Sequence, residues 1–222
     1  MTTVLFTKDK VFCDTQVTRC NDVASLDCIK FFPLSDGSIA YGAGSLSEIV
    51  ASVAMYEGID EKLPIEQYIT GSGTTLIIVK PSGFIDRFKP KRKPRRDTEA
   101  GSSKPRTPIL FWKGTEPYVA IGSGRPHIEA HYTYVDHNPK RAMINAAKRD
   151  TGTGDRIFEL PRHWEKGESV EIKFYDGFTR RDKYRKPITI TLEFPKDPSW
   201  IYDALVGKRD LYPINLKEII GA

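Results

Sequence analysis

The chain has 222 residues, a hydrophobic fraction of 39% and a formal net charge of +5, which suits one domain with a substantial core. No stretch approaches the roughly 18 uninterrupted apolar residues of a membrane-spanning helix, and charges from Lys8 onward interrupt any signal-peptide pattern. Three cysteines, Cys13, Cys20 and Cys28, show no CxxC spacing, which favours reduced thiols over a disulfide framework or a zinc site. We therefore expect a cytoplasmic protein without membrane attachment and without a metal or cofactor.

Positive charge is concentrated in one segment of the chain. Between Arg87 and Arg106 nine Lys or Arg residues accompany two acidic ones, a net of +7, so the rest of the chain carries −2. The segment is rich in Pro, Gly and Ser and cannot bury enough apolar surface to order itself. We predict a disordered basic insertion over residues 87–107, forming a long loop between two strands. Its alternatives are a solvated linker and an arm that contacts nucleic acid or an acidic partner.

The first part of the chain predicts two β-hairpins. TTVLFT and KVFCDT flank a loop at residues 8–10, and such a loop would pair Val4 with Asp14. DCIKFFPL and SIAYGA form a second hairpin that turns at Ser-Asp-Gly, residues 35–37. The first pairing brings the Asp14 carboxylate close to the N-terminus of the chain.

Helical periodicity begins after the second hairpin. SLSEIVASVAMY has apolar residues at helical spacing, with Ser45 or Ser47 as its N-cap. Two more helices are predicted over residues 125–137 and 139–149, separated at Asn-Pro. TTLIIVKPSGFI and ILFWKGTEPYVAIGSG read as strands around the insertion, and SVEIKFYD and ITITLEF as strands near the C-terminus. This order indicates an α+β fold of antiparallel sheets with helices outside them.

The opening sequence MTT makes Thr2 a candidate nucleophile. A small side chain at position 2 favours removal of Met1, which would leave a hydroxyl and a free α-amine on one residue. An α-amine has an unperturbed pKa of about 7.7–8, so it can accept a proton near neutral pH. Asp14, at the end of the second strand, and Lys30, a single charge in the run CIKFFPL, are the expected ion pair beside it. The alternatives are a turn aspartate and an exposed lysine.

Three motifs, together with the glycine at position 44 in YGAGS, resemble the proteasome β-subunit and its bacterial relative, the HslV peptidase, both N-terminal-nucleophile (Ntn) hydrolases. In that family an N-terminal threonine is followed by an aspartate and, sixteen residues later, by a lysine, as Asp14 and Lys30 are spaced here. AIGSG matches a string of the family whose serine lies close to the catalytic amine, which implies that role for Ser123. KRDTGTGD resembles the family's Arg-Asp-x-x-Ser-Gly motif through Asp150 and through Thr153, which replaces the serine.

The resemblance implies a role for each of these residues. Thr2 would attack a peptide carbonyl while its own amine takes the proton, directly or through water, and the resulting acyl-enzyme ester would hydrolyse. Lys30, paired with Asp14, would lower the pKa of the nucleophile and of the amine. The backbone N–H of Gly44, or of Ala43 in an alternative register, would stabilise the oxyanion. The amine and its water would be held by the remaining motif residues, Ser123, Asp150 and Thr153.

The resemblance covers about residues 2–154 without the insertion and implies a four-layer αββα sandwich. We expect a single domain over residues 1–222 with a β-rich C-terminal extension over 156–222. The family implies peptide or unfolded-protein substrates, a homo-oligomeric ring and an ATP-dependent unfoldase partner. The chain departs from the family at YEGIDEKLPIEQYITGSG, which has room only for a short helical turn, broken by Pro64, where the family has a second long helix.

Two other functions are compatible with the sequence. A catalytically inactive scaffold or binding module would keep Met1 and use the basic insertion to engage nucleic acid or protein. A non-peptidase Ntn amidase would act on a small amide. His127 and His131 in HIEAH lie one helical turn apart, but their order is not that of the HExxH zinc peptidases and no third ligand is obvious, so we expect no metal there.

Overall fold

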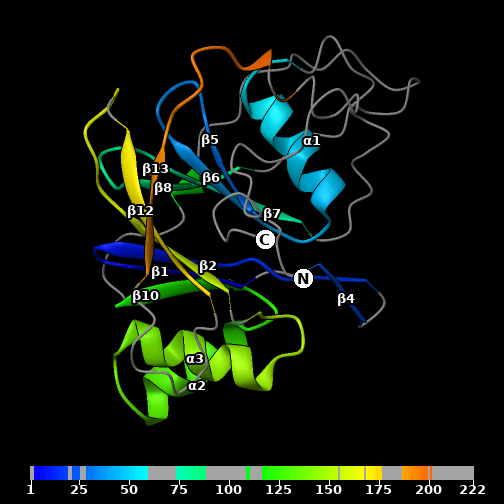
Figure 1. Cartoon of the computed structure of the whole chain (residues 1–222), viewed down its shortest axis with the longest axis vertical. Coiled ribbons are helices and arrows are strands. Elements are labelled where there is room, and N and C mark those ends of the chain that lie inside the picture. Colours follow the sequence, from blue (N-terminus) through cyan, green and yellow to red (C-terminus); the bar gives the residue numbers. More distant parts are fainter. Residues whose placement is uncertain are drawn as a thin grey trace.

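The described part of the chain contains two large antiparallel sheets, one small two-stranded sheet and three helices (Figure 1). The computed structural model describes residues 3–19, 22–25, 29–59, 74–88, 109–110, 117–154, 156–167, 169–176, 187–199 and 201, with the backbone alone for 17–19, 22–25 and 109–110. Thr2, most of the basic insertion and residues 202–222 lie outside these ranges. Within them, no helix has the length and apolar character needed to cross a membrane.

The first sheet has six strands in the order β10-β1-β2-β11-β12-β13, each antiparallel to its neighbour. Their bounds are β1 Thr3–Thr7, β2 Lys10–Asp14, β10 Tyr118–Gly122, β11 Ile157–Pro161, β12 Val170–Tyr175 and β13 Ile188–Leu192. Most of these segments are rich in β-branched and aromatic residues, as strands with a buried face require. β11, which was not singled out from the sequence, joins the N-terminal hairpin to the C-terminal strands β12 and β13.

The second sheet has five strands in the order β5-β6-β7-β8-β9. Their bounds are β5 Phe31–Pro33, β6 Ile39–Ala43, β7 Thr75–Val79, β8 Ile85–Phe88 and β9 Ile109–Leu110. A separate two-stranded sheet contains β3 Val17–Arg19 and β4 Asp22–Ser25. β8 pairs with β9 through Arg87 and Ile109, which confirms that the insertion connects two paired strands. Its predicted start is wrong by two residues, because Arg87 and Phe88 belong to β8.

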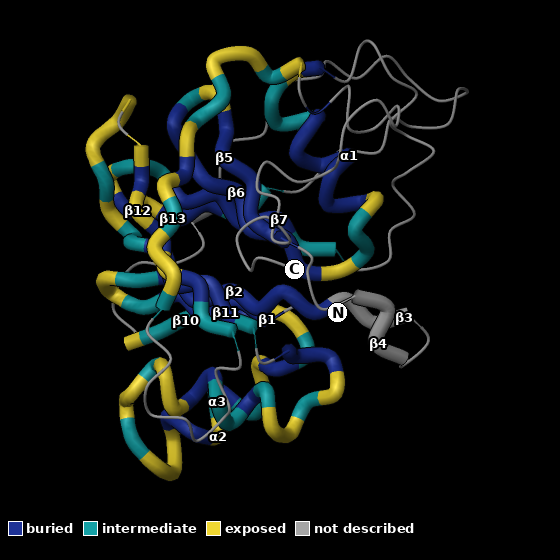
Figure 2. The backbone as a smooth tube through the Cα atoms, in the orientation of Figure 1, coloured by how far each residue is buried: buried dark blue, intermediate teal, exposed yellow. Residues whose placement is uncertain are grey.

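Side-chain alternation sorts the strand residues into layers. One core lies between the sheets, a second between the five-stranded sheet and α1 (Leu46–Tyr56), and a third between the six-stranded sheet and the pair α2 (Arg125–Tyr134) and α3 (Pro139–Arg149). In β1, for example, Val4 and Phe6 lie in the core between the sheets, whereas Leu5 lies under the helices. Figures 1 and 2 show the sheets facing each other, with helices on their outer sides. The predicted α+β class is confirmed.

The register of the first hairpin differs from its prediction. Val4 lies opposite Cys13, not opposite Asp14, and the loop is the two residues between Thr7 and Lys10. The Thr7 hydroxyl closes this tight turn, because it donates to the Lys10 carbonyl at 2.9 Å and accepts from the Lys10 N–H at 3.1 Å. The shift of one position brings Thr3 beside Asp14, with consequences for the site.

The helices begin and end close to their predicted positions. Ser45 precedes α1 as its N-cap, although its side chain makes no capping hydrogen bond. α2 ends at Tyr134, three residues before its predicted end. Asn138 caps α3, since its side-chain oxygen accepts from two N–H groups of the first turn. This cap turns the chain back, so that α2 and α3 cover one face of the same sheet together.

Candidate active site

The predicted site residues gather at one edge of the two sheets, because antiparallel pairing aligns the ends of strands. In the six-stranded sheet Thr3 lies opposite Gly122 and Asp14 opposite Ile157. The start of β1, the ends of β2 and β10 and the start of β11 therefore meet. In the five-stranded sheet Lys30 directly precedes β5, and Gly44 directly follows its antiparallel partner β6.

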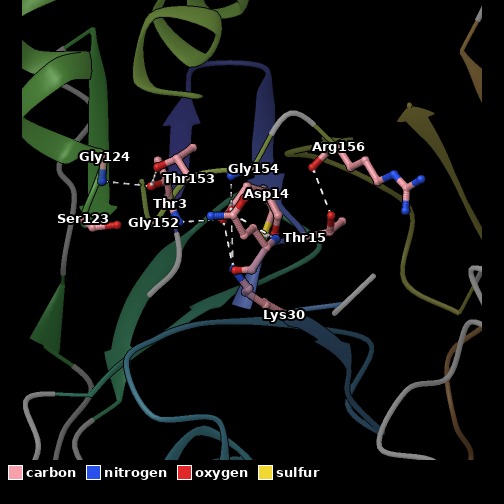
Figure 3. Close-up of polar contacts among 12 residues, drawn as sticks. Thr3, Asp14, Thr15, Lys30, Ser123, Gly124, Gly152, Thr153, Gly154 and Arg156 are labelled. Atoms are coloured by element: carbon pink, nitrogen blue, oxygen red, sulfur yellow. Dashed lines mark hydrogen bonds and ion pairs between the residues drawn. The ribbon is translucent and has the colours of Figure 1, made fainter. Parts of the chain in front are cut away.

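Asp14 and Lys30 form an ion pair inside the protein (Figure 3). The Lys30 ammonium lies 3.2 and 3.3 Å from the two carboxylate oxygens, and the side chains are only 2% and 0% exposed. Lys30 also donates to the Gln16 carbonyl. Three backbone N–H groups complete the donors to the carboxylate, those of Thr3 at 2.7 Å, Gln16 at 3.2 Å and Gly154 at 3.1 Å. Lys30 is therefore a buried, paired lysine and not an exposed one. It lies directly before β5, whereas it was expected within the strand.

A second carboxylate, Asp150, collects hydroxyl groups at the end of α3. It accepts from the Ser123 hydroxyl at 2.6 Å, from the Thr153 hydroxyl at 2.5 Å and from the Gly152 N–H at 3.0 Å. Burial by itself would raise the pKa of Asp150, but these hydrogen bonds stabilise the charged form and lower the pKa below its ordinary value. Asp150 is therefore ionised at neutral pH.

Thr3 connects the two carboxylates. Its backbone N–H donates to Asp14, and its side-chain oxygen lies 2.5 Å from that of Thr153 and accepts from the Gly124 N–H at 2.9 Å. Thr3 is fully buried. Gly124 has no room for a side chain, because a Cβ there would lie 2.6 Å from the hydroxyl oxygens of both Thr3 and Thr153. The close approach of three backbone segments thus depends on glycine at this position.

Gly44 directly follows β6 of the five-stranded sheet. Its backbone conformation, with φ of +127°, favours glycine. A Cβ there would also come within 2.7 Å of the Thr74 Cα. The residue is exposed. Gly44 lies just beyond the paired residues of β6, whereas Ala43, the alternative, is a buried residue of β6 paired with Thr75. A backbone N–H at such a position is a candidate donor to a developing oxyanion.

Other candidate residues have different surroundings. Thr2, the predicted nucleophile, lies outside the described residues. His131 is buried, and its Nε2 lies 2.9 Å from the Asp136 carboxylate in the turn after α2, so it contributes to that turn. Within the described ranges no three His, Cys, Asp or Glu side chains come together as metal ligands. Cys13 is buried in the core between the sheets, and its thiol donates to the Asp14 carbonyl at 3.5 Å.

Comparison with solved structures finds similar chains. The chain resembles the crystal structure of eukaryotic HslV from Trypanosoma brucei, with 17% sequence identity, a TM-score of 0.47 and coverage of 71% of this chain and 97% of that chain. No family model matches the sequence. No curated protein matches it either. A similarity of this size does not establish a family or an activity for the chain.

Sequence reasoning missed several residues that hold the site together. Thr3, Gln16, Gly124 and Gly154 all contribute hydrogen bonds at its centre. The signal for the glycines was present, since both lie within motifs that were singled out, AIGSG and DTGTGD. Thr3 gave no signal, because a threonine in a strand is ordinary and its importance depends on the hairpin register.

Proposed function

We propose that the chain is a threonine peptidase of the proteasome and HslV type, with the αββα arrangement of that family and with Thr2 as its nucleophile once Met1 is removed. The observation that carries this proposal is the buried Asp14–Lys30 pair joined through Thr3 to Thr153 and Asp150. Burying an ammonium and a carboxylate is costly. A catalytic role for residue 2 would explain why such a costly network lies directly beside it in the sequence.

In this mechanism the Thr2 hydroxyl attacks a peptide carbonyl and its proton passes to the Thr2 α-amine, directly or through water. Lys30 supplies a fixed positive charge that favours the alkoxide form of the nucleophile and lowers the pKa of the amine. Asp14 holds the ammonium in place, since both its oxygens lie close to the Lys30 Nζ. The attack forms an ester to Thr2, and the amine returns its proton to the departing amine of the substrate. Water then hydrolyses the ester.

The remaining predicted residues hold the amine and the oxyanion. The Ser123 hydroxyl, fixed by its hydrogen bond to Asp150, orients the amine together with Thr153. The backbone N–H of Gly44 donates to the oxyanion of the tetrahedral intermediate. Thr3 is not the nucleophile of this proposal, because it is fully buried and its backbone nitrogen is an amide that donates to Asp14.

The test is the intact mass of the purified protein before and after incubation with a peptide epoxyketone, which reacts with a hydroxyl and an α-amine on the same threonine. We expect a mass lower than that of the full sequence by one methionine, and an adduct of one inhibitor per chain. Thr2→Ala should form no adduct. Thr133→Ala is the matched control, since Thr133 lies exposed on α2 and its hydroxyl donates to the Glu129 carbonyl in the same helix. A processed protein that gives no adduct after assembly has been verified would contradict the proposal.

Assembly and localisation belong to the same proposal. We propose a homo-oligomeric ring in the cytoplasm that degrades unfolded protein delivered by an ATP-dependent unfoldase. Native mass spectrometry of the processed protein measures the number of copies, and a monomer at micromolar concentration would contradict the ring. Deletion of residues 89–107 tests the insertion separately: binding of nucleic acid that weakens steeply with salt and is lost on deletion would assign it that role.

A further inference from the structure

The hydrogen bonds around Thr3 have a single consistent direction. Asp150 is ionised and can only accept, so the hydroxyls of Ser123 and Thr153 must both donate to it. A hydroxyl has one proton. The Thr153 oxygen must therefore accept at its contact with Thr3, and the Thr3 hydroxyl is the donor over that 2.5 Å. Thr3 in turn accepts from the Gly124 N–H.

These four groups form a hydroxyl relay, Thr3 to Thr153 to Asp150, with Ser123 as a second donor to the same carboxylate. Because the proton of the Ser123 hydroxyl is donated to Asp150, only the lone pairs of its oxygen remain available. The Ser123 oxygen can therefore only accept a hydrogen bond from a neighbouring amine. A neutral amine has two N–H groups and one lone pair. Acceptors that hold the N–H groups leave the lone pair free to take a proton from the nucleophile.

We infer that Thr3 is a positioning residue for the reaction proposed above: its hydroxyl connects the Gly124 N–H to the Thr153 oxygen, and so holds in place the Thr153–Asp150–Ser123 group that orients the Thr2 amine in that reaction. The inference rests on the proposed function. Loss of the hydroxyl would leave the Gly124 N–H without its acceptor and the Thr153 oxygen without its donor, in a region where Thr3 and Thr153 are 0% and 3% exposed. Thr153 would keep its hydrogen bond to Asp150 but lose the second contact that fixes its side chain, so the geometry around Asp150 and Ser123 would loosen.

The experiment compares Thr3→Val, which keeps the shape and removes the hydroxyl, with Thr3→Ser, which keeps the hydroxyl. The rate of covalent reaction with the peptide epoxyketone is measured as kinact and KI across pH, with thermal denaturation of each variant alongside. We expect kinact of the valine variant to fall by about tenfold or more while KI changes less than about twofold. The serine variant should recover to within about threefold of wild type.

The pH profile separates positioning from a structural role. Hydroxyl acceptors and the ionised Asp150 stabilise the protonated amine, so loosening them lowers the amine pKa and moves the acid limb of kinact to lower pH in the valine variant. A purely structural defect reduces the amount of reactive protein without moving that limb.

Wild-type kinetics in the valine variant, or a loss with an unmoved acid limb that matches the unfolded fraction, would overturn the role of Thr3 and leave the proposed function standing. A wild-type protein that forms no Thr2 adduct would overturn the proposed function, and the inference with it. A lower kinact and a shifted acid limb in Thr3→Val, with recovery in Thr3→Ser, would support the positioning role of Thr3.

Discussion

The buried ion pair between Asp14 and Lys30 allows a quantitative prediction for the substitution Lys30→Met. Methionine has nearly the length of lysine and no charge, so the variant leaves the shape of the site and removes the cation. The Asp14 carboxylate, 0% exposed, would retain its three backbone N–H donors but no opposite charge. Desolvation of an ion that has lost its partner dominates the cost in such cases.

The magnitude follows from the distance. Two unit charges 3.2 Å apart attract each other by about 5 kcal/mol at an effective dielectric constant of about 20. Removal of one partner of a buried pair costs about 3–5 kcal/mol in measured cases, so we expect the free energy of unfolding to fall by that amount in Lys30→Met. Asp14→Asn should cost a similar amount. The double variant should cost about 2–3 kcal/mol less than the sum of the single ones, because neither charge is then left unpaired.

Urea denaturation at pH 7, followed by circular dichroism, measures these free energies by linear extrapolation. Lys80→Met is the matched control: Lys80 pairs with Asp36 at 2.7 Å, but the side chains are 31% and 40% exposed, so its loss should cost about 1 kcal/mol or less. Additive costs for Asp14→Asn and Lys30→Met, within about 0.5 kcal/mol, would refute the coupling and with it the account of the site as a buried charge pair.

Three further substitutions test other parts of the structure. In Gly124→Ala the backbone is acceptable, with φ of −77°, but the new Cβ would lie 2.6 Å from two hydroxyl oxygens. We expect the free energy of unfolding to fall by about 1–3 kcal/mol and adduct formation to be at least tenfold slower. Wild-type behaviour in both assays would contradict the contact. Burial raises the pKa of Glu159, but hydrogen bonds from Lys10, Tyr175 and Lys140 outweigh it and lower the pKa below the ordinary 4.5. The ionised Glu159 therefore stabilises the fold above about pH 4.5 and loses this contribution as the pH falls. The difference in unfolding free energy between wild type and Glu159→Gln should shrink between about pH 6 and pH 3. A difference that does not change with pH in urea titrations would contradict this. The buried Tyr41 hydroxyl has no hydrogen-bond partner in the described part of the chain, so Tyr41→Phe should leave the melting temperature unchanged or raise it, and a fall of several degrees would reveal a partner.

Local patterns in the sequence predicted most of the elements correctly. The Ser-Asp-Gly turn, the helical spacing after Ser45 and the break between two helices at Asn138-Pro139 depend on neighbours within a few residues, so they can be predicted without knowledge of the fold. The predicted partnership of Asp14 and Lys30 also followed from a general constraint, since a charge within an apolar run must either reach water or find an opposite charge. The spacing of these two residues, together with AIGSG and KRDTGTGD, indicates a common site from the sequence alone.

Other features required the tertiary structure. The three-residue loop predicted for the first hairpin is wrong, because the Thr7 hydroxyl closes a two-residue turn and this register brings Thr3 beside Asp14. The insertion of β11 between β2 and β12 depends on pairing across more than a hundred residues, which no local pattern encodes. The role of Thr3 depends on both, because its hydroxyl acquires partners only where the ends of β1 and β10 meet the loop after α3. Residue types determined which groups needed partners, whereas the packing of distant segments decided which partners they received.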